Sequence, residues 1–128
     1  MPQFWTDYVV VCCSNVEAAK RWWIEAFNCT PTKAPADWDN PFPSDIALKL
    51  PQDETPHILL TDRAERNAEG ETRQATDHPI MFCNNLKKAY EHFRGKGFAP
   101  GAIQDGGGTQ FFEIRDPDGN VIEICEEP

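Results

Sequence analysis

Two carboxylates ten residues apart, Glu113 and Glu123, are the side chains best placed to do chemistry. Each lies within a run of apolar residues, and the turn sequence Asp-Pro-Asp-Gly-Asn at 116–120 separates the two runs. Proline presets φ at the second turn position, and glycine accepts the positive φ that closes a type I turn with a bulge. The runs are therefore predicted to form a hairpin with Glu113 directly opposite Glu123. The same face would carry Phe111, Val121 and Cys125.

Like charges that face each other on a largely apolar surface destabilise a sheet unless a cation, a proton or a basic neighbour relieves them. One interpretation is that Glu113 and Glu123 belong to a functional site. The alternative is a solvated edge at which Arg115, on the same strand, neutralises Glu113. The hairpin alone leaves both interpretations open, because structural ion pairs also bring charges together.

Size and charge exclude several functional classes. The 128 residues suffice for a single domain over residues 1–128, and 12 basic against 21 acidic residues give a net charge of −9. This balance argues against nucleic-acid partners and against anionic membrane surfaces, and weakly favours cationic ligands. The chain has neither an apolar run of membrane-spanning length nor a secretory signal pattern, so we expect a cytoplasmic protein.

The cysteines predict neither a zinc site nor a redox pair. Their number is odd, and no two are spaced as Cys-x-x-Cys. We expect reduced thiols, mostly buried in strands. The five are Cys12, Cys13, Cys29, Cys83 and Cys125.

The chain contains an internal repeat, in which residues 78–86 resemble residues 8–16. In both copies an apolar, strand-like run meets a helix start, and helices are predicted over 16–27 and 86–95. Ser14 with Glu17 fits a capping box for the first helix, and Asn84 or Asn85 would cap the second. Three strands can follow each helix, which makes the pattern βαβββ twice. They are predicted at 30–33, 45–50 and 57–61, and at 98–103, 111–115 and 121–125.

Two segments lie outside this repeat. Residues 62–77 are polar and lack an apolar period, so they are predicted to link a first module, about 1–62, to a second, about 78–128. Residues 34–44 are rich in proline and carry Trp38 and Phe42. Such a loop is either a lid over a site or a staple onto the core.

A duplicated βαβββ unit whose last hairpin reads Asp-Pro-Asp-Gly-Asn-Val-Ile-Glu-Ile resembles the vicinal oxygen chelate superfamily. This group contains glyoxalases, bleomycin-resistance proteins and extradiol dioxygenases, and the resemblance covers essentially the whole chain. It implies an α+β fold in which two βαβββ modules form a cupped mixed sheet with helices on the outside. It also implies a ligand inside the cup and, often, a homodimer.

The resemblance further implies four metal-ligand positions, two in each module. The second module has His78 and Glu123 there, whereas the first has Tyr8 and Leu59 in place of the usual ligands. Glu113 stands where several metal-dependent members have a tyrosine beside the metal. His78, Glu113 and Glu123 would suit Mn, Fe, Zn, Ni or Mg, with Glu113 moving a proton and Tyr8 as proton donor or weak fourth ligand.

Two functions remain open at this point. The first is a metal-free protein that binds a small molecule in the cup, with no proven chemistry. The alternative is a metal-dependent enzyme, either a glyoxalase-like lyase or isomerase or a dioxygenase, that uses His78, Glu113 and Glu123. In both cases the expected partners are a small-molecule ligand and a second copy of the chain. The ligand-binding residues would be Tyr8, Trp38, Phe42, Phe111 and Arg115.

Overall fold

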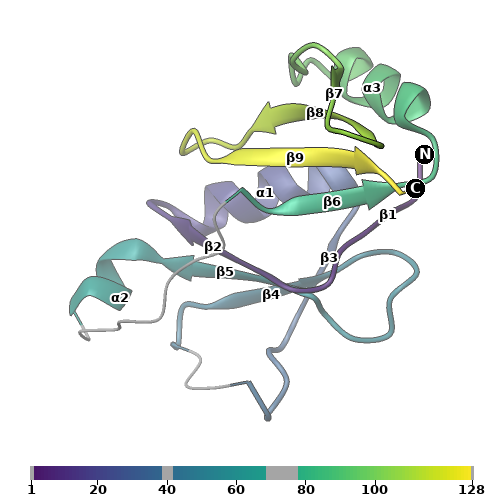
Figure 1. The fold of residues 1–128 in the computed structure, drawn as a ribbon. Coiled ribbons are helices and arrows are strands. Elements are labelled where there is room, and N and C mark those ends of the chain that lie inside the picture. Colours follow the sequence, from purple (N-terminus) through teal and green to yellow (C-terminus); the bar gives the residue numbers. More distant parts are fainter. Residues whose placement is uncertain (1, 39–41, 69–77, 128) are drawn as a thin grey trace. The chain divides into compact units, whose positions relative to one another are not determined.

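The structure is a computed structural model that describes residues 2–38, 42–68 and 78–127. The chain separates into two units (Figure 1). The first-module unit comprises residues 7–77, and the second-module unit comprises residues 1–6 together with 78–128. The predicted α+β class is confirmed, and each unit contains its own mixed sheet.

The first-module unit is a four-stranded sheet with the order β2-β5-β4-β3, in which β2 runs parallel to β5. Its long helix α1 contacts β5, and α1 buries Trp23 completely. In chain order the elements are β2 (Val9–Cys13), α1 (Val16–Phe27), β3 (Thr30–Thr32), β4 (Ile46–Lys49), β5 (Ile58–Asp62) and α2 (Arg63–Ala68).

The second-module unit is a five-stranded sheet with the order β1-β6-β9-β8-β7, in which β6 runs parallel to β9. Figure 1 shows its helix α3 beside the strands at the C-terminal end of the chain. The elements are β1 (Phe4–Trp5), β6 (Ile80–Cys83), α3 (Leu86–Gly95), β7 (Gln104–Asp105), β8 (Gln110–Arg115) and β9 (Val121–Glu126).

Both long helices begin and end where the sequence predicts, but the cap of α1 differs. The side chain of Asn15, not that of Ser14, accepts the amide of Ala18 at 3.0 Å. In α3 the equivalent residue is Asn85, which accepts the amide of Lys88 at 3.1 Å. Asparagine is among the strongest N-cap residues, because its side-chain oxygen satisfies an otherwise unpaired first-turn amide.

One predicted strand is wrong, and two short elements were not predicted. The strand predicted at 98–103 is absent, because Gly97 and Ala99 both have positive φ, and only the two-residue β7 follows. Within residues 62–77, which were predicted to link the two modules, the structure has the short helix α2, and Asp62 accepts the amide of Glu65 at 2.8 Å. The other element that was not predicted is β1, which pairs with β6. Residues 69–77 lie outside the described part of the chain.

The C-terminal hairpin forms as predicted. The amide of Asp116 donates to the carbonyl of Asn120 at 3.0 Å, and Gly119 has φ of 80°. The buried Asp116 carboxylate also accepts the amides of Asp118 and Asn120, at 3.0 and 2.8 Å. This turn therefore holds the register of β8 against β9. Among the helices that the structure describes, none is long and apolar enough to cross a membrane.

Candidate functional site

The sheet of the second-module unit has two unlike faces. Toward α3, the side chains of β8 and β9 are at most 1% exposed, and Phe93 of the helix lies 6.0 Å from Phe112 between ring centroids. The opposite side, here called the open face, carries half-buried side chains from the same strands. The residues toward α3 are Phe112, Ile114, Ile122 and Ile124, and those on the open face include Phe111, Glu113, Val121, Glu123 and Cys125.

Strand register arranges the open face in rows, because paired residues of neighbouring strands point to the same side. The aromatic row crosses all five strands and consists of Trp5, Phe82, Cys125, Phe111 and Gln104. The carboxylate row lies two residues further along each strand and consists of Ile80, Glu123 and Glu113. The aromatic row brings the start of the chain into the same surface as its last hairpin.

The predicted opposition of Glu113 and Glu123 is confirmed by the register of β8 and β9. Arg115 lies on the same face, opposite Val121, but its Nη1 donates to the carbonyl of Gly119 at 3.3 Å. Within the described part of the chain, Arg115 forms no ion pair with Glu113. The two half-buried carboxylates therefore face each other without the basic neighbour that the structural interpretation required.

His78 lies outside the strand ladder. It is exposed and precedes β6 by two residues, and its φ of 47° places its backbone in the left-handed region. The next residue, Pro79, is buried, and its carbonyl accepts the amide of Glu123 at 2.8 Å. Residues 2–38, 42–68 and 78–127 contain no cluster of three His, Cys, Asp or Glu side chains suited to a metal ion. The metal role of His78 and Glu123 stays a prediction.

The two positions of the first module that would carry metal ligands, Tyr8 and Leu59, lie in apolar surroundings. Leu59 is buried in a cluster with Val10 and Ala47, and Trp38 packs against that cluster. Trp38 therefore acts as the staple that was one of the two alternatives for its loop. Tyr8 is 44% exposed, and its ring meets Trp38 edge-on at 5.1 Å. Because the Leu59 side chain has no donor atom, this position cannot supply a metal ligand, and the implied four-ligand shell does not fit the residues present.

Phe42 is the third aromatic residue predicted to bind a ligand in this unit. It borders a shallow depression of about 580 Å³ that also includes Lys20, Thr32 and Asp45. Its amide donates to the Asp45 carboxylate at 2.9 Å. Of the predicted ligand-binding residues, Tyr8 and Trp38 thus meet in one unit, while Phe111 and Arg115 share the open face of the other.

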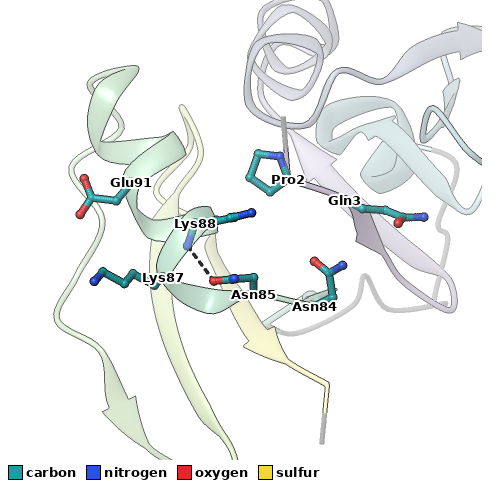
Figure 2. A pocket seen from close by; sticks show the side chains of 7 residues that line it. All are labelled: Pro2, Gln3, Asn84, Asn85, Lys87, Lys88 and Glu91. Carbon is teal, nitrogen blue, oxygen red and sulfur yellow. Dashed lines mark hydrogen bonds between the residues drawn. The ribbon is translucent and has the colours of Figure 1, made fainter.

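A larger depression of about 740 Å³ lies at the start of α3 and contains none of the predicted site residues (Figure 2). Lysines at a helix start suggest an anion site, but the first-turn amide of Leu86 already binds the Glu126 carboxylate at 2.9 Å. The chain thus supplies its own anion there. The lining residues are Pro2, Gln3, Asn84, Asn85, Lys87, Lys88 and Glu91.

The cysteines differ in how their surroundings affect the thiol. Burial raises the pKa of Cys29 to about 12, with a smaller contribution from the nearby Asp53 carboxylate. Burial also raises the pKa of Cys83 to about 11. All five cysteines are free, and Cys12 and Cys125 are the two that are not fully buried. Only Cys125 lies on the open face, where its sulfur is 3.7 Å from the Thr109 hydroxyl.

Sequence reasoning missed four residues of the open face, namely Trp5, Ile80, Phe82 and Gln104. Alternation within the apolar run 80–83 was a sufficient signal for Ile80 and Phe82, since residues two apart on a strand share a face. No sequence signal identified Trp5, because a two-residue strand is too short to show a period. Its position follows from pairing with Phe82, while its neighbour Phe4 packs on Phe93 at 5.5 Å.

Comparisons with known proteins agree with this architecture. The sequence model of the Glyoxalase/Bleomycin resistance protein/Dioxygenase superfamily matches residues 5–124. Among solved structures, lactoylglutathione lyase from Agrobacterium tumefaciens is 15% identical, with a TM-score of 0.69 over 93% of this chain and 90% of its own. An antibiotic binding protein from Streptomyces sp. CB03234 is 16% identical, with a TM-score of 0.70 over 97% of this chain and 96% of its own.

A glyoxylase/bleomycin resistance protein/dioxygenase domain from Frankia sp. EAN1pec is 18% identical, with a TM-score of 0.66 over 97% of this chain and 92% of its own. None of the curated proteins matches the sequence. At these identities the structural likenesses establish the fold, whereas the match to the superfamily model covers nearly the full length. The chain belongs to the Glyoxalase/Bleomycin resistance protein/Dioxygenase superfamily.

Proposed function

We propose that this protein binds a small molecule on the open face of its second-module unit and that binding needs no metal. The observation that carries the proposal is the aromatic row next to two facing carboxylates without a basic partner. Large half-buried rings with a few polar groups at fixed positions are typical of ligand sites. A carboxylate pair of this kind lowers the stability of the folded protein. Its presence on a largely apolar face is therefore best explained by a role in binding a ligand.

The antibiotic binding protein among the structural relatives supports a binding role for this fold. The first-module residues support it as well, since Leu59 has no atom that could ligate a metal. Phe111, Glu113, Glu123 and Arg115 would contact or orient the ligand on the open face. Tyr8 and Trp38 form an aromatic pair in the first-module unit, and their part in binding stays a prediction.

A chemically diverse library of cationic, neutral and anionic small molecules tests the proposal. We expect at least one compound to raise the unfolding midpoint in proportion to the logarithm of its concentration, as mass action requires. Calorimetry then measures its affinity for two variants. Cys125→Phe fills the middle of the aromatic row, whereas Lys87→Ala/Lys88→Ala alters the depression in Figure 2.

Binding should be lost in Cys125→Phe and unchanged in the double-lysine variant. The reverse result would place the ligand at the start of α3 and overturn the proposal. Circular dichroism of both variants confirms that each is folded before binding is compared.

A second candidate is a divalent-metal site, favoured by the direct opposition of Glu113 and Glu123. Two carboxylates are suitable ligands for Mn or Mg, and such an ion would polarise substrate oxygens if bound. Calorimetric titration with Mn, Mg, Zn, Ni and Fe(II) separates the candidates. Stoichiometric binding that is lost in both His78→Ala and Glu123→Gln supports the metal site, and no binding in wild type rejects it.

A further inference from the structure

We infer the chemical class of the ligand, an inference that rests on the proposed function: a flat aromatic group bearing an ammonium group a short spacer away. The open face divides into an aromatic row and a carboxylate row, and each row recognises one half of such a molecule.

The aromatic row recognises the flat half. Trp5, Phe82 and Phe111 are half-buried, and strand pairing connects them through Cys125. Neighbouring strands lie about 4.8 Å apart, so Trp5 and Phe111 stand about 14 Å from each other with Phe82 and the thiol between them. A planar ring system that lies along this row contacts two or more of these side chains at once. Aromatic pairs of this kind are favoured beyond the area that they bury.

The carboxylate row recognises the charged half. Glu113 and Glu123 lie two residues along the strands from Phe111 and Cys125, which corresponds to a shift of about 7 Å on the same face. An ammonium group there donates hydrogen bonds to both carboxylates and removes their mutual repulsion. Charge-assisted hydrogen bonds of this type are about twice as strong as neutral ones.

Charge also excludes the opposite class of ligand. Arg115 is exposed, and its guanidinium donates to the turn carbonyl of Gly119 rather than to the carboxylate row. An anionic ligand would therefore meet two half-buried carboxylates with little to offset them. The net charge of −9 repels anions further at long range.

Three indoles of matched shape test the inference: tryptamine, which is cationic, tryptophol, which is neutral, and indole-3-propionate, which is anionic. Calorimetry at low salt should show tryptamine binding at least about tenfold more tightly than tryptophol, with indole-3-propionate weakest. In Glu113→Gln/Glu123→Gln the three affinities should become equal within about threefold. The preference should also shrink in 0.5 M NaCl, because salt screens the charges.

Trp5→Leu provides the complementary variant. It retains an apolar side chain in β1 but removes the ring, so it should weaken all three indoles by a similar factor and leave the order unchanged. Phe111→Leu should act in the same way, which keeps the test valid if either variant folds poorly.

Equal binding of tryptamine and tryptophol to wild type, or a preference that survives in the double glutamine variant, overturns the inference. If no indole binds while the diverse library yields a ligand that Cys125→Phe abolishes, the ligand class is wrong and the proposed function stands. If the library also yields nothing, both fail.

Discussion

Replacing Glu113 by glutamine measures the cost of the facing carboxylates directly. The residue is paired with Glu123 across β8 and β9, both side chains are half-buried, and Arg115 bonds to the turn carbonyl of Gly119. Glutamine keeps the shape of the side chain and removes its charge. The ligand-free protein should therefore become more stable near neutral pH.

The size of the gain follows from the separation of the charges. With paired side chains about 5 Å apart, Coulomb repulsion is about 0.8 kcal/mol in water and about 3 kcal/mol at an effective dielectric constant of 20. Cross-strand pairs change stability by up to about 1 kcal/mol in practice, so we expect Glu113→Gln to raise the free energy of unfolding by about 1 kcal/mol. For a chain of this length that gain raises the midpoint of thermal unfolding by about 4 °C.

Urea unfolding of both proteins at 20 mM and 1 M NaCl is the assay. The gain should shrink to a few tenths of a kcal/mol, about 0.3, in high salt, where the Debye length falls to about 3 Å. Glu91→Gln on α3 is the matched control, because Glu91 is exposed and lies outside the sheet. Its stability should change by less than about 0.5 kcal/mol in either salt.

A Glu113→Gln protein that is less stable than wild type would refute the reasoning. That result would mean that Glu113 has a favourable charge partner in solution, with Arg115 as the obvious one. A gain that is the same at both salt concentrations would also refute it, because the gain would not be electrostatic.

Three further predictions follow from other parts of the structure. Asn85→Ala should lower the free energy of urea unfolding by about 1 kcal/mol, because the Asn85 side chain caps α3, whereas Asn84→Ala at the exposed preceding residue should change it by less than about 0.5 kcal/mol. Above pH 9 the unfolded chain loses the Cys29 proton while the folded protein, with a thiol pKa raised to about 12, keeps it. The Cys29 thiol should therefore lower the free energy of unfolding by about 1.4 kcal/mol for each pH unit in this range. Urea unfolding from pH 8 to 11 should show that the free energy of unfolding declines less steeply with pH in Cys29→Ala than in wild type. Equal declines in the two proteins would contradict the raised pKa of Cys29. Finally, we propose a homodimer, so light scattering at micromolar concentration should return twice the 14.5 kDa chain mass, and a monomer mass would reject the proposal.

The parts of the fold that could be predicted depend on local sequence. The turn at 116–120 needs only a proline, a glycine and two side-chain oxygens within five residues, and it alone determines which residues of β8 and β9 face each other. The bounds of α1 and α3 follow from apolar spacing and from asparagine at the cap. For the same reason the pairing of Glu113 with Glu123 could be predicted from the sequence of the turn.

Local sequence led to a wrong prediction in two places. At residues 98–103 the backbone conformation excludes the predicted strand, and at the start of α1 two neighbouring residues compete as the N-cap. Residues 98–103 have apolar members, but positive φ at Gly97 and Ala99 turns the chain away from an extended path. Ser14 and Asn15 are both good N-cap residues, and Asn15 is the one whose side-chain oxygen accepts the amide of Ala18 at the start of α1.

The amino-acid sequence by itself determined the family, the two helices and the facing carboxylates, because each depends on residues close together in the chain. Tertiary structure alone decided what surrounds the carboxylates. Trp5 joins their face through pairing with Phe82, a residue 77 positions later, and Leu59 becomes a core residue through packing with Val10 and Ala47. Such long-range pairings depend on how much surface whole strands and helices can bury against one another. No short stretch of sequence therefore determines them.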